Sequence, residues 1–110
     1  MESWNLNELQ VDPRSPQVLE SEDEGRAIVI NLPAGEELQE HQVHERAWVV
    51  VVSGNVEIAA GGDSISGGPG LLAVFDPKER HEVRAVEDSR VLLVLSPWPG
   101  DGHPSQPKGS

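Results

Sequence analysis

Apolar and polar residues alternate in short stretches along much of the region from Ala27 to Leu95, with the period of two that is typical of β-strands. Turns rich in glycine, proline or acidic residues separate these stretches, and no segment shows a long helical period. The pattern predicts strands over residues 17–20, 26–32, 38–43, 46–53, 56–58, 64–66, 71–75, 81–86 and 90–95. Many short strands with frequent turns predict an all-β barrel or sandwich.

The strand over residues 46–53 is unusual because Val49 to Val52 places apolar side chains on both faces. Such a strand is either buried on both sides or has one face in a core and the other in an interface. The core is also small for a self-sufficient domain, since the apolar residues are concentrated in roughly 70 positions. We therefore expect a homodimer, with Trp48 on the outer face packing against another strand or a second subunit.

The composition of the two ends sets them apart from the barrel. Residues 1–16 are polar and contain Pro13 and Pro16, which predicts an extended N-terminal arm with Trp4 and Leu6 as anchors. Residues 17–98 form the predicted barrel domain, and Trp98 is expected to cover one of its ends. Residues 99–110 are rich in proline, glycine and serine, which predicts a disordered tail in which His103 has no assigned role.

Charge and residue usage exclude several classes of function. The net charge of −11 repels phosphate backbones and anionic lipid, so we expect no nucleic-acid partner. The chain has no cysteine, which excludes disulfides, thiolate metal sites and cysteine catalysis. The first ten residues are polar and acidic, unlike a signal peptide, and the apolar run Ala47 to Val52 is too short to span a bilayer. We expect a cytoplasmic protein with no membrane partner.

Two histidines stand at fixed distances from glycines. Gly35 is followed after five residues by His41, and Gly54 ends the same region; Gly70 is followed after five residues by Asp76-Pro77, and His81 comes shortly after. This spacing resembles the two motifs of the cupin family, G-x5-H-x-H-x(3,4)-E-x6-G and G-x5-P-x-G-x2-H-x3-N. The resemblance covers about Arg26 to Ser96. It implies a cupin-type antiparallel β-barrel, a jelly roll of six to eight strands without long helices.

The chain departs from these motifs at several positions. Val43 stands at the second histidine position and Ala47 at the glutamate position of the first motif, and Ala85 replaces the asparagine of the second. The second motif also has Asp76 in place of proline and Lys78 in place of its second glycine. Of the four ligand positions that the resemblance implies, only His41 and His81 therefore keep a histidine.

The resemblance implies a ligand pocket in the barrel lined by His41, His81, Val43, Ala47 and Val49. A metal held only by protein needs at least three converging donors, and His44 is the first candidate for the third. His44 is one residue out of register with His41, and a β-bulge would reverse its direction. The resulting site of His41, His44 and His81 would hold Fe, Mn, Ni, Zn or Cu.

The alternative is that His41 and His81 are neutral, hydrogen-bonded residues of a metal-free pocket. Arg80, beside His81, would meet a substrate carboxylate or form a salt bridge at the rim.

Three functions are consistent with these residues. The first is a small cupin that binds a small molecule in its barrel, as a sensor, carrier or accessory module. The second is a metal-dependent cupin enzyme of the dioxygenase or isomerase type, whose catalytic residues the sequence does not identify. The third is a metal-free barrel that acts in protein contacts through the face bearing Trp48 and Val50. The glycine-rich turns precede strands, so they do not form the phosphate-binding loops that open helices.

Overall fold

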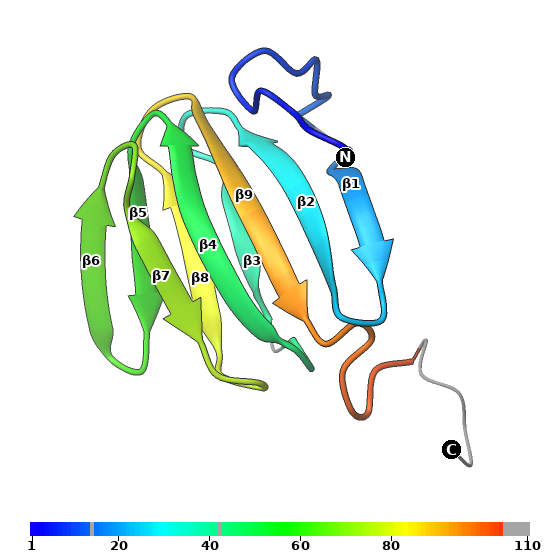
Figure 1. The fold of residues 1–110 in the computed structure, drawn as a ribbon. Helices are drawn as coiled ribbons and strands as arrows, with labels where there is room; N and C mark the ends of the chain where they lie inside the picture. Colours follow the sequence, from blue (N-terminus) through cyan, green and yellow to red (C-terminus); the bar gives the residue numbers. More distant parts are fainter. Residues whose placement is uncertain (14, 42, 105–110) are drawn as a thin grey trace.

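The computed structural model describes residues 1–13, 15–41 and 43–104, and for residues 39–41 it describes the backbone alone. These residues form two antiparallel sheets and no helix, which confirms the all-β prediction (Figure 1). No described helix is therefore long and apolar enough to cross a membrane. The strands are β1 (Gln17–Glu22), β2 (Gly25–Leu32), β3 (Glu37–His41), β4 (Arg46–Ser53), β5 (Val56–Ala60), β6 (Asp63–Gly67), β7 (Leu72–Phe75), β8 (His81–Ala85) and β9 (Ser89–Ser96).

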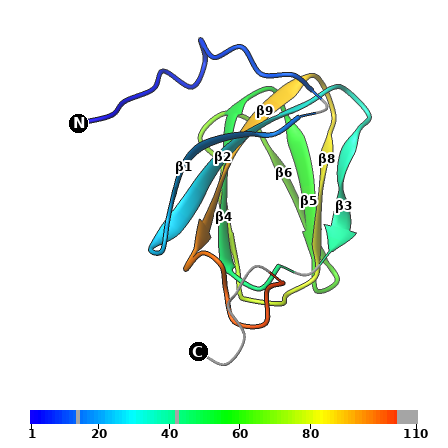
Figure 2. The ribbon, with the colours of Figure 1, turned by 90° about the vertical axis from the view of Figure 1, so that its right-hand side faces the viewer.

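The two sheets lie face to face, as the side view in Figure 2 shows. One sheet has the order β1-β2-β9-β4-β7 and the other the order β3-β8-β5-β6. The described strands number nine rather than six to eight, because each of the nine predicted segments forms a strand and β1 adds an edge to the larger sheet.

Alternate residues of each strand point between the sheets and fill the core. In β4, Ala47, Val49 and Val51 are buried, and the register places Val49 opposite Leu93 and Val51 opposite Val91. The facing sheet contributes the same alternation from β5 and β8. Its buried apolar residues are Val56, Ile58, Val83 and Ala85. The period of two in the sequence therefore predicts which residues of these strands are buried in the core.

The outer face of the larger sheet is also apolar at its centre. Trp48 lies opposite Val94 of β9 and Val74 of β7 in the ladders that flank β4. Leu72 and Val74 are 55% and 47% exposed, respectively. We call Trp48, Val50, Leu72, Val74, Leu92 and Val94 the outer-face patch.

The N-terminal arm is attached to the larger sheet by hydrogen bonds. The Asn31 side chain donates to the backbone oxygen of Val11 at 2.7 Å, and the Arg90 guanidinium donates to the backbone oxygen of Leu6 at 2.6 Å. Trp4 is 40% exposed, and Leu6 is partly buried. Polar side chains of β2 and β9 therefore contribute to holding the arm.

The segment that follows β9 differs from the disordered tail predicted from residue 99. The Trp98 N–H donates to the backbone oxygen of Asp23 at 3.2 Å, and the Trp98 side chain packs against the core. Gly100 is buried, and its N–H donates to the carboxylate of Glu45 at 2.7 Å. Composition suggested disorder, but these contacts fold residues 97–104, which we call the C-terminal strap, under one end of the barrel (Figure 2). Residues 105–110 lie outside the described part.

Candidate functional site

His81 is the first residue of β8 and lies on the inner face of its sheet. It shares its parity with the buried Val83 and Ala85, and it is 5% exposed. Its ring stacks on Phe75 of β7, with centroids 4.0 Å apart and planes inclined by 8°. Its Nδ1 lies 3.2 Å from the backbone oxygen of Glu79. A carbonyl oxygen only accepts hydrogen bonds, so Nδ1 is the donor in this contact.

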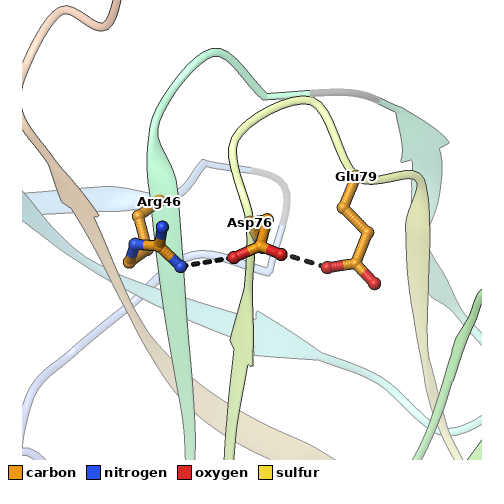
Figure 3. A network of polar contacts seen from close by, with 3 residues as sticks. All are labelled: Arg46, Asp76 and Glu79. Atoms are coloured by element: carbon orange, nitrogen blue, oxygen red, sulfur yellow. Dashed lines mark hydrogen bonds and ion pairs between the residues drawn. The ribbon is translucent and has the colours of Figure 1, made fainter.

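The turn between β7 and β8, which leads to His81, contains a network of polar contacts (Figure 3). Asp76 accepts from the Arg46 guanidinium at 2.5 Å, and its own N–H donates to the Glu79 carboxylate at 3.0 Å. The Lys78 N–H donates to the backbone oxygen of Val43 at 2.7 Å. Lys78 has a φ of 67°, in the left-handed region that glycine adopts most readily. This explains why the resembled motif has glycine here.

His41 and His81 are paired in the ladder between β3 and β8, where the register shifts between Leu38 and His41. The side chain of His41 lies outside the described residues. His44 follows β3, and its ring meets that of His103 edge-on with centroids 5.7 Å apart. Its Nδ1 is buried and has no hydrogen-bond partner in the described part of the chain. His44 therefore faces the C-terminal strap, while the ring of His81 faces Phe75.

No group of three or more histidine, aspartate or glutamate side chains could hold a metal ion among the residues whose side chains are described. The predicted site of His41, His44 and His81 includes a side chain outside that set and stays a prediction. Val43 and Ala47, at two of the four ligand positions that the resemblance implies, carry no donor atom. Ala47 is fully buried and Val43 packs against the same apolar core. The described residues at these positions do not fit the implied four-ligand set.

Val49, another predicted pocket residue, is packed in the core like Ala47. Ala47 and Val49 are 0% and 1% exposed and belong to the continuous apolar core. The described cavities lie elsewhere, toward the strand ends and the edges of the two sheets.

A cleft is lined by residues of β6 and β7, the last strands of their respective sheets. These two edge strands lie on the same side of the sandwich (Figure 1), and they do not pair with each other. The cleft has a volume of about 280 Å³. It is lined by Ile58, Ala60, Asp63, Ile65, Ala73, Val74, Phe75 and Glu79. We call it the β6–β7 cleft; its walls are mainly apolar, and both of its ionisable residues are carboxylates.

A second cavity of about 240 Å³ adjoins this cleft and includes His81. Ala60 lines both cavities, and the stacked rings of Phe75 and His81 belong to one cavity each. The other residues of the second cavity are Ala59, Gly61, Gly62, Arg80 and Glu82. The two cavities therefore meet around Ala60 and the ring pair.

A third cavity, of about 340 Å³, is lined by Asn7 and Pro13 of the N-terminal arm and by residues at the ends of β2, β4 and β9. Its polar wall residues already serve the fold: Arg90 donates to Asn31 at 2.7 Å, and the Ser89 hydroxyl accepts from the Asn55 N–H at 3.0 Å. We therefore regard the β6–β7 cleft, next to His81, as the better candidate site despite its smaller volume.

Glu45 is a buried polar residue whose position the sequence did not reveal. It is 1% exposed, and its Oε2 accepts from the Gly100 N–H at 2.7 Å. Glu45 shares the parity of the buried Ala47 and Val49, but an ionisable side chain is rarely buried without a partner, and the sequence does not identify that partner. Its partner comes from a segment 55 residues away in the chain.

Comparison with known proteins adds a family and a set of related folds. A family model described as "Cupin domain" matches residues 28–97. A crystal structure of an RmlC-like cupin protein from Desulfovibrio desulfuricans is 27% identical, with a TM-score of 0.78 over 88% of this chain and 97% of that one.

Two more distant structures share the fold. A cupin-2 domain containing protein from Shewanella frigidimarina is 18% identical, with a TM-score of 0.72 over 84% of this chain and 93% of that one. The cupin domain of Schizosaccharomyces pombe Cnp3 is 14% identical, with a TM-score of 0.77 over 86% and 73%. Comparison with curated protein sequences gives no match.

Proposed function

The chain belongs to the cupin family, and from that premise we propose that it binds a small molecule in the β6–β7 cleft. The supporting observation is that this cleft, about 280 Å³ in volume, reaches the Phe75 ring that stacks on the inner-facing His81. An apolar cavity of about 150 Å³ is enough to hold benzene. The cleft therefore suits a ligand somewhat larger than benzene, close to the lower size limit of small-molecule sites.

Each wall of the cleft has a definable role in this binding. Ile58 and Ile65 would remove apolar ligand surface from water, at about 25 cal/mol for each Å² buried. Phe75 would offer its ring, whose plane is fixed by the stacked His81. His81 would act mainly by holding this wall, because its ring stacks on that of Phe75.

The test is a screen of small apolar and amphipathic molecules by thermal shift, followed by calorimetry. Ala73→Leu should fill the cleft and abolish binding, and Ile65→Ser should weaken it without inserting bulk into the sandwich. Ala34→Leu makes the same size change at an exposed turn outside the cleft and should bind normally. A screen without binders, or binders that ignore both cleft variants, would refute the proposal.

A second candidate is a metal-dependent cupin enzyme of the dioxygenase or isomerase type. It would hold Fe, Mn, Ni, Zn or Cu through His41, His44 and His81. The pairing of His41 with His81 between β3 and β8 favours it. Elemental mass spectrometry on protein purified without an affinity tag or chelator is the test, beside His41→Ala and His81→Ala. Near-stoichiometric metal that is lost in both variants supports this candidate, and protein that neither contains nor takes up metal eliminates it.

We further propose that two copies associate through the outer-face patch. Trp48 and Val50 lie at its centre, and the exposed Leu72 and Val74 extend it. Trp48→Ala or Val50→Lys should shift the protein to monomers in sedimentation, whereas Val18→Lys, an exposed apolar residue of β1, should leave the assembly intact. A wild-type protein that stays monomeric at high concentration would contradict the homodimer.

A metal-free barrel that uses this patch for protein contacts is the remaining alternative. It would keep its function in His41→Ala and His81→Ala and lose it in Trp48→Ala. The cytoplasmic location expected from the composition stays a prediction.

A further inference from the structure

The ionisable residues that line the β6–β7 cleft, Asp63 and Glu79, are both acidic. We propose that the ligand of this cleft is a small organic cation, an amine carried on an apolar body. This inference rests on the proposed binding function and adds the chemical class of the ligand. Three observations carry it: the sign of the wall charges, the placement of the nearby basic groups and the apolar lining.

Glu79 keeps the capacity to receive an ammonium group. Its Oε1 accepts the Asp76 N–H at 3.0 Å, which fixes the carboxylate at the end of the β7–β8 turn. A carboxylate has two oxygens and about four lone-pair positions, so one backbone donor does not exhaust it. Asp63 contributes the second negative charge from the first position of β6.

Lys78 and Arg80, the basic residues on either side of Glu79 in the sequence, are not among the residues that line the cleft, and neither is Arg46. Arg46 is engaged by Asp76 at 2.5 Å, as Figure 3 shows. Arg80 lines the second cavity, where Glu82 is also present. An anionic ligand in the cleft would therefore meet two carboxylates without a compensating cation in the wall. The net charge of −11 acts in the same direction and favours the approach of cations.

The apolar part of the ligand matches the rest of the lining. Ile58, Ile65 and Ala73 provide aliphatic surface, and the Phe75 ring can attract a cation over its face. The volume of about 280 Å³ exceeds the roughly 150 Å³ that holds benzene. A phenyl ring with a two-carbon ammonium arm is a molecule of suitable size and shape.

The experiment compares three probes that share one apolar body: 2-phenylethylamine, 2-phenylethanol and phenylacetate. Calorimetry at neutral pH and low salt should give the amine about fivefold tighter binding than the carboxylate, with the alcohol between, as expected for partly exposed charge pairs. High salt should reduce this difference, because exposed charges are screened.

Three variants test whether the preference for the amine probe arises in the cleft. Glu79→Gln keeps an acceptor for the Asp76 N–H and should bring amine affinity down to that of the alcohol, while alcohol affinity stays constant. Asp63→Asn should have a similar but smaller effect, because Asp63 is exposed. Glu36→Gln removes one charge at an exposed turn outside the cleft and should not change the ratio.

The outcomes separate this inference from the binding function beneath it. Equal affinity for the three probes would overturn the inference and leave small-molecule binding intact. Tightest binding of phenylacetate would also overturn it and would direct attention to Arg80 in the second cavity. No binding of any probe at millimolar concentration, together with a failed screen, would overturn both.

Discussion

Gly100→Ala should detach the C-terminal strap, because the structure leaves no room for a methyl group at this position. A Cβ built on Gly100 would lie 2.3 Å from the backbone oxygen of His44 and 3.0 Å from Oε2 of Glu45. Real Cβ atoms do not approach backbone oxygens this closely, so the strap has to move. The movement separates the Gly100 N–H from the carboxylate that it binds at 2.7 Å.

The size of the effect follows from the burial of Glu45. This side chain is 1% exposed, and a hydrogen bond to a charged group contributes about 1.5–3 kcal/mol. Displacement of the strap also weakens the packing of Trp98 against the core. We expect the free energy of unfolding to fall by about 2–3 kcal/mol, which lowers the melting temperature by about 10 °C in a domain of this size.

Urea unfolding followed by circular dichroism measures the loss, and the amide resonance of Gly100 reports whether the strap is released. Gly35→Ala is the comparison, because Gly35 has a φ of +85° and open space around the added methyl. It should cost about 1 kcal/mol from the backbone conformation alone.

The double variant Gly100→Ala/Glu45→Ala should lose clearly less free energy of unfolding than the sum of the two single variants. Each single variant already removes the same contact, the hydrogen bond between Gly100 and Glu45. A Gly100→Ala protein with an unchanged unfolding midpoint and additive behaviour with Glu45→Ala would refute the reasoning.

Three further outcomes follow from other parts of the structure. Ser89→Ala should lower the free energy of unfolding by about 1–2 kcal/mol in urea titrations, because the buried Ser89 hydroxyl accepts the Asn55 N–H at 3.0 Å. Lys78→Gly should raise it by about 0.5–1 kcal/mol, because Lys78 holds a φ of 67°. The pKa of Glu2 should lie above 4.5 in a carboxyl NMR titration, because its hydrogen bond with Glu20 and the repulsion from that carboxylate both raise it. This contribution to stability is present below the unfolded pKa and is lost as the pH rises through the folded pKa.

Each of these outcomes has a matched comparison. Ser66→Ala removes an exposed hydroxyl and should change stability by less than about 0.5 kcal/mol. Lys78→Ala removes the side chain and keeps the left-handed backbone, so a gain as large as that of Lys78→Gly would contradict the strain argument. Glu20→Gln should lower the pKa of Glu2, and an unchanged titration would show that Glu20 is not the cause.

The strands could be predicted from the sequence because their signals are local. Residues 46–53 show the alternation that buries Ala47, Val49 and Val51, and glycine turns mark where the strands end. The inner-facing position of His81 follows from the same period of two, since it shares parity with Val83 and Ala85. Short-range patterns of this kind depend only on the geometry of a single strand.

The candidate site was less predictable because its parts meet only in three dimensions. The β6–β7 cleft exists because two edge strands, separated in the chain by a turn and belonging to different sheets, end on the same side of the sandwich. The sequence predicts that Ile65 belongs to a short strand, but it does not indicate that Ile65 and Phe75 line the same cleft. The contact of Gly100 with Glu45 likewise joins residues far apart in the chain, one in a segment whose composition suggests disorder.

The position of the cleft at the free edges of both sheets has a consequence for motion. β6 pairs only with β5, and its residues from Asp63 to Ser66 are exposed, so the protection of its amides against hydrogen exchange should be among the lowest in the barrel. We expect the cleft to widen by a small outward movement of β6, while β5 stays paired with β8 and keeps its buried side chains in the core. If the cleft binds a ligand as proposed, we expect exchange of that ligand to be faster than unfolding of the domain.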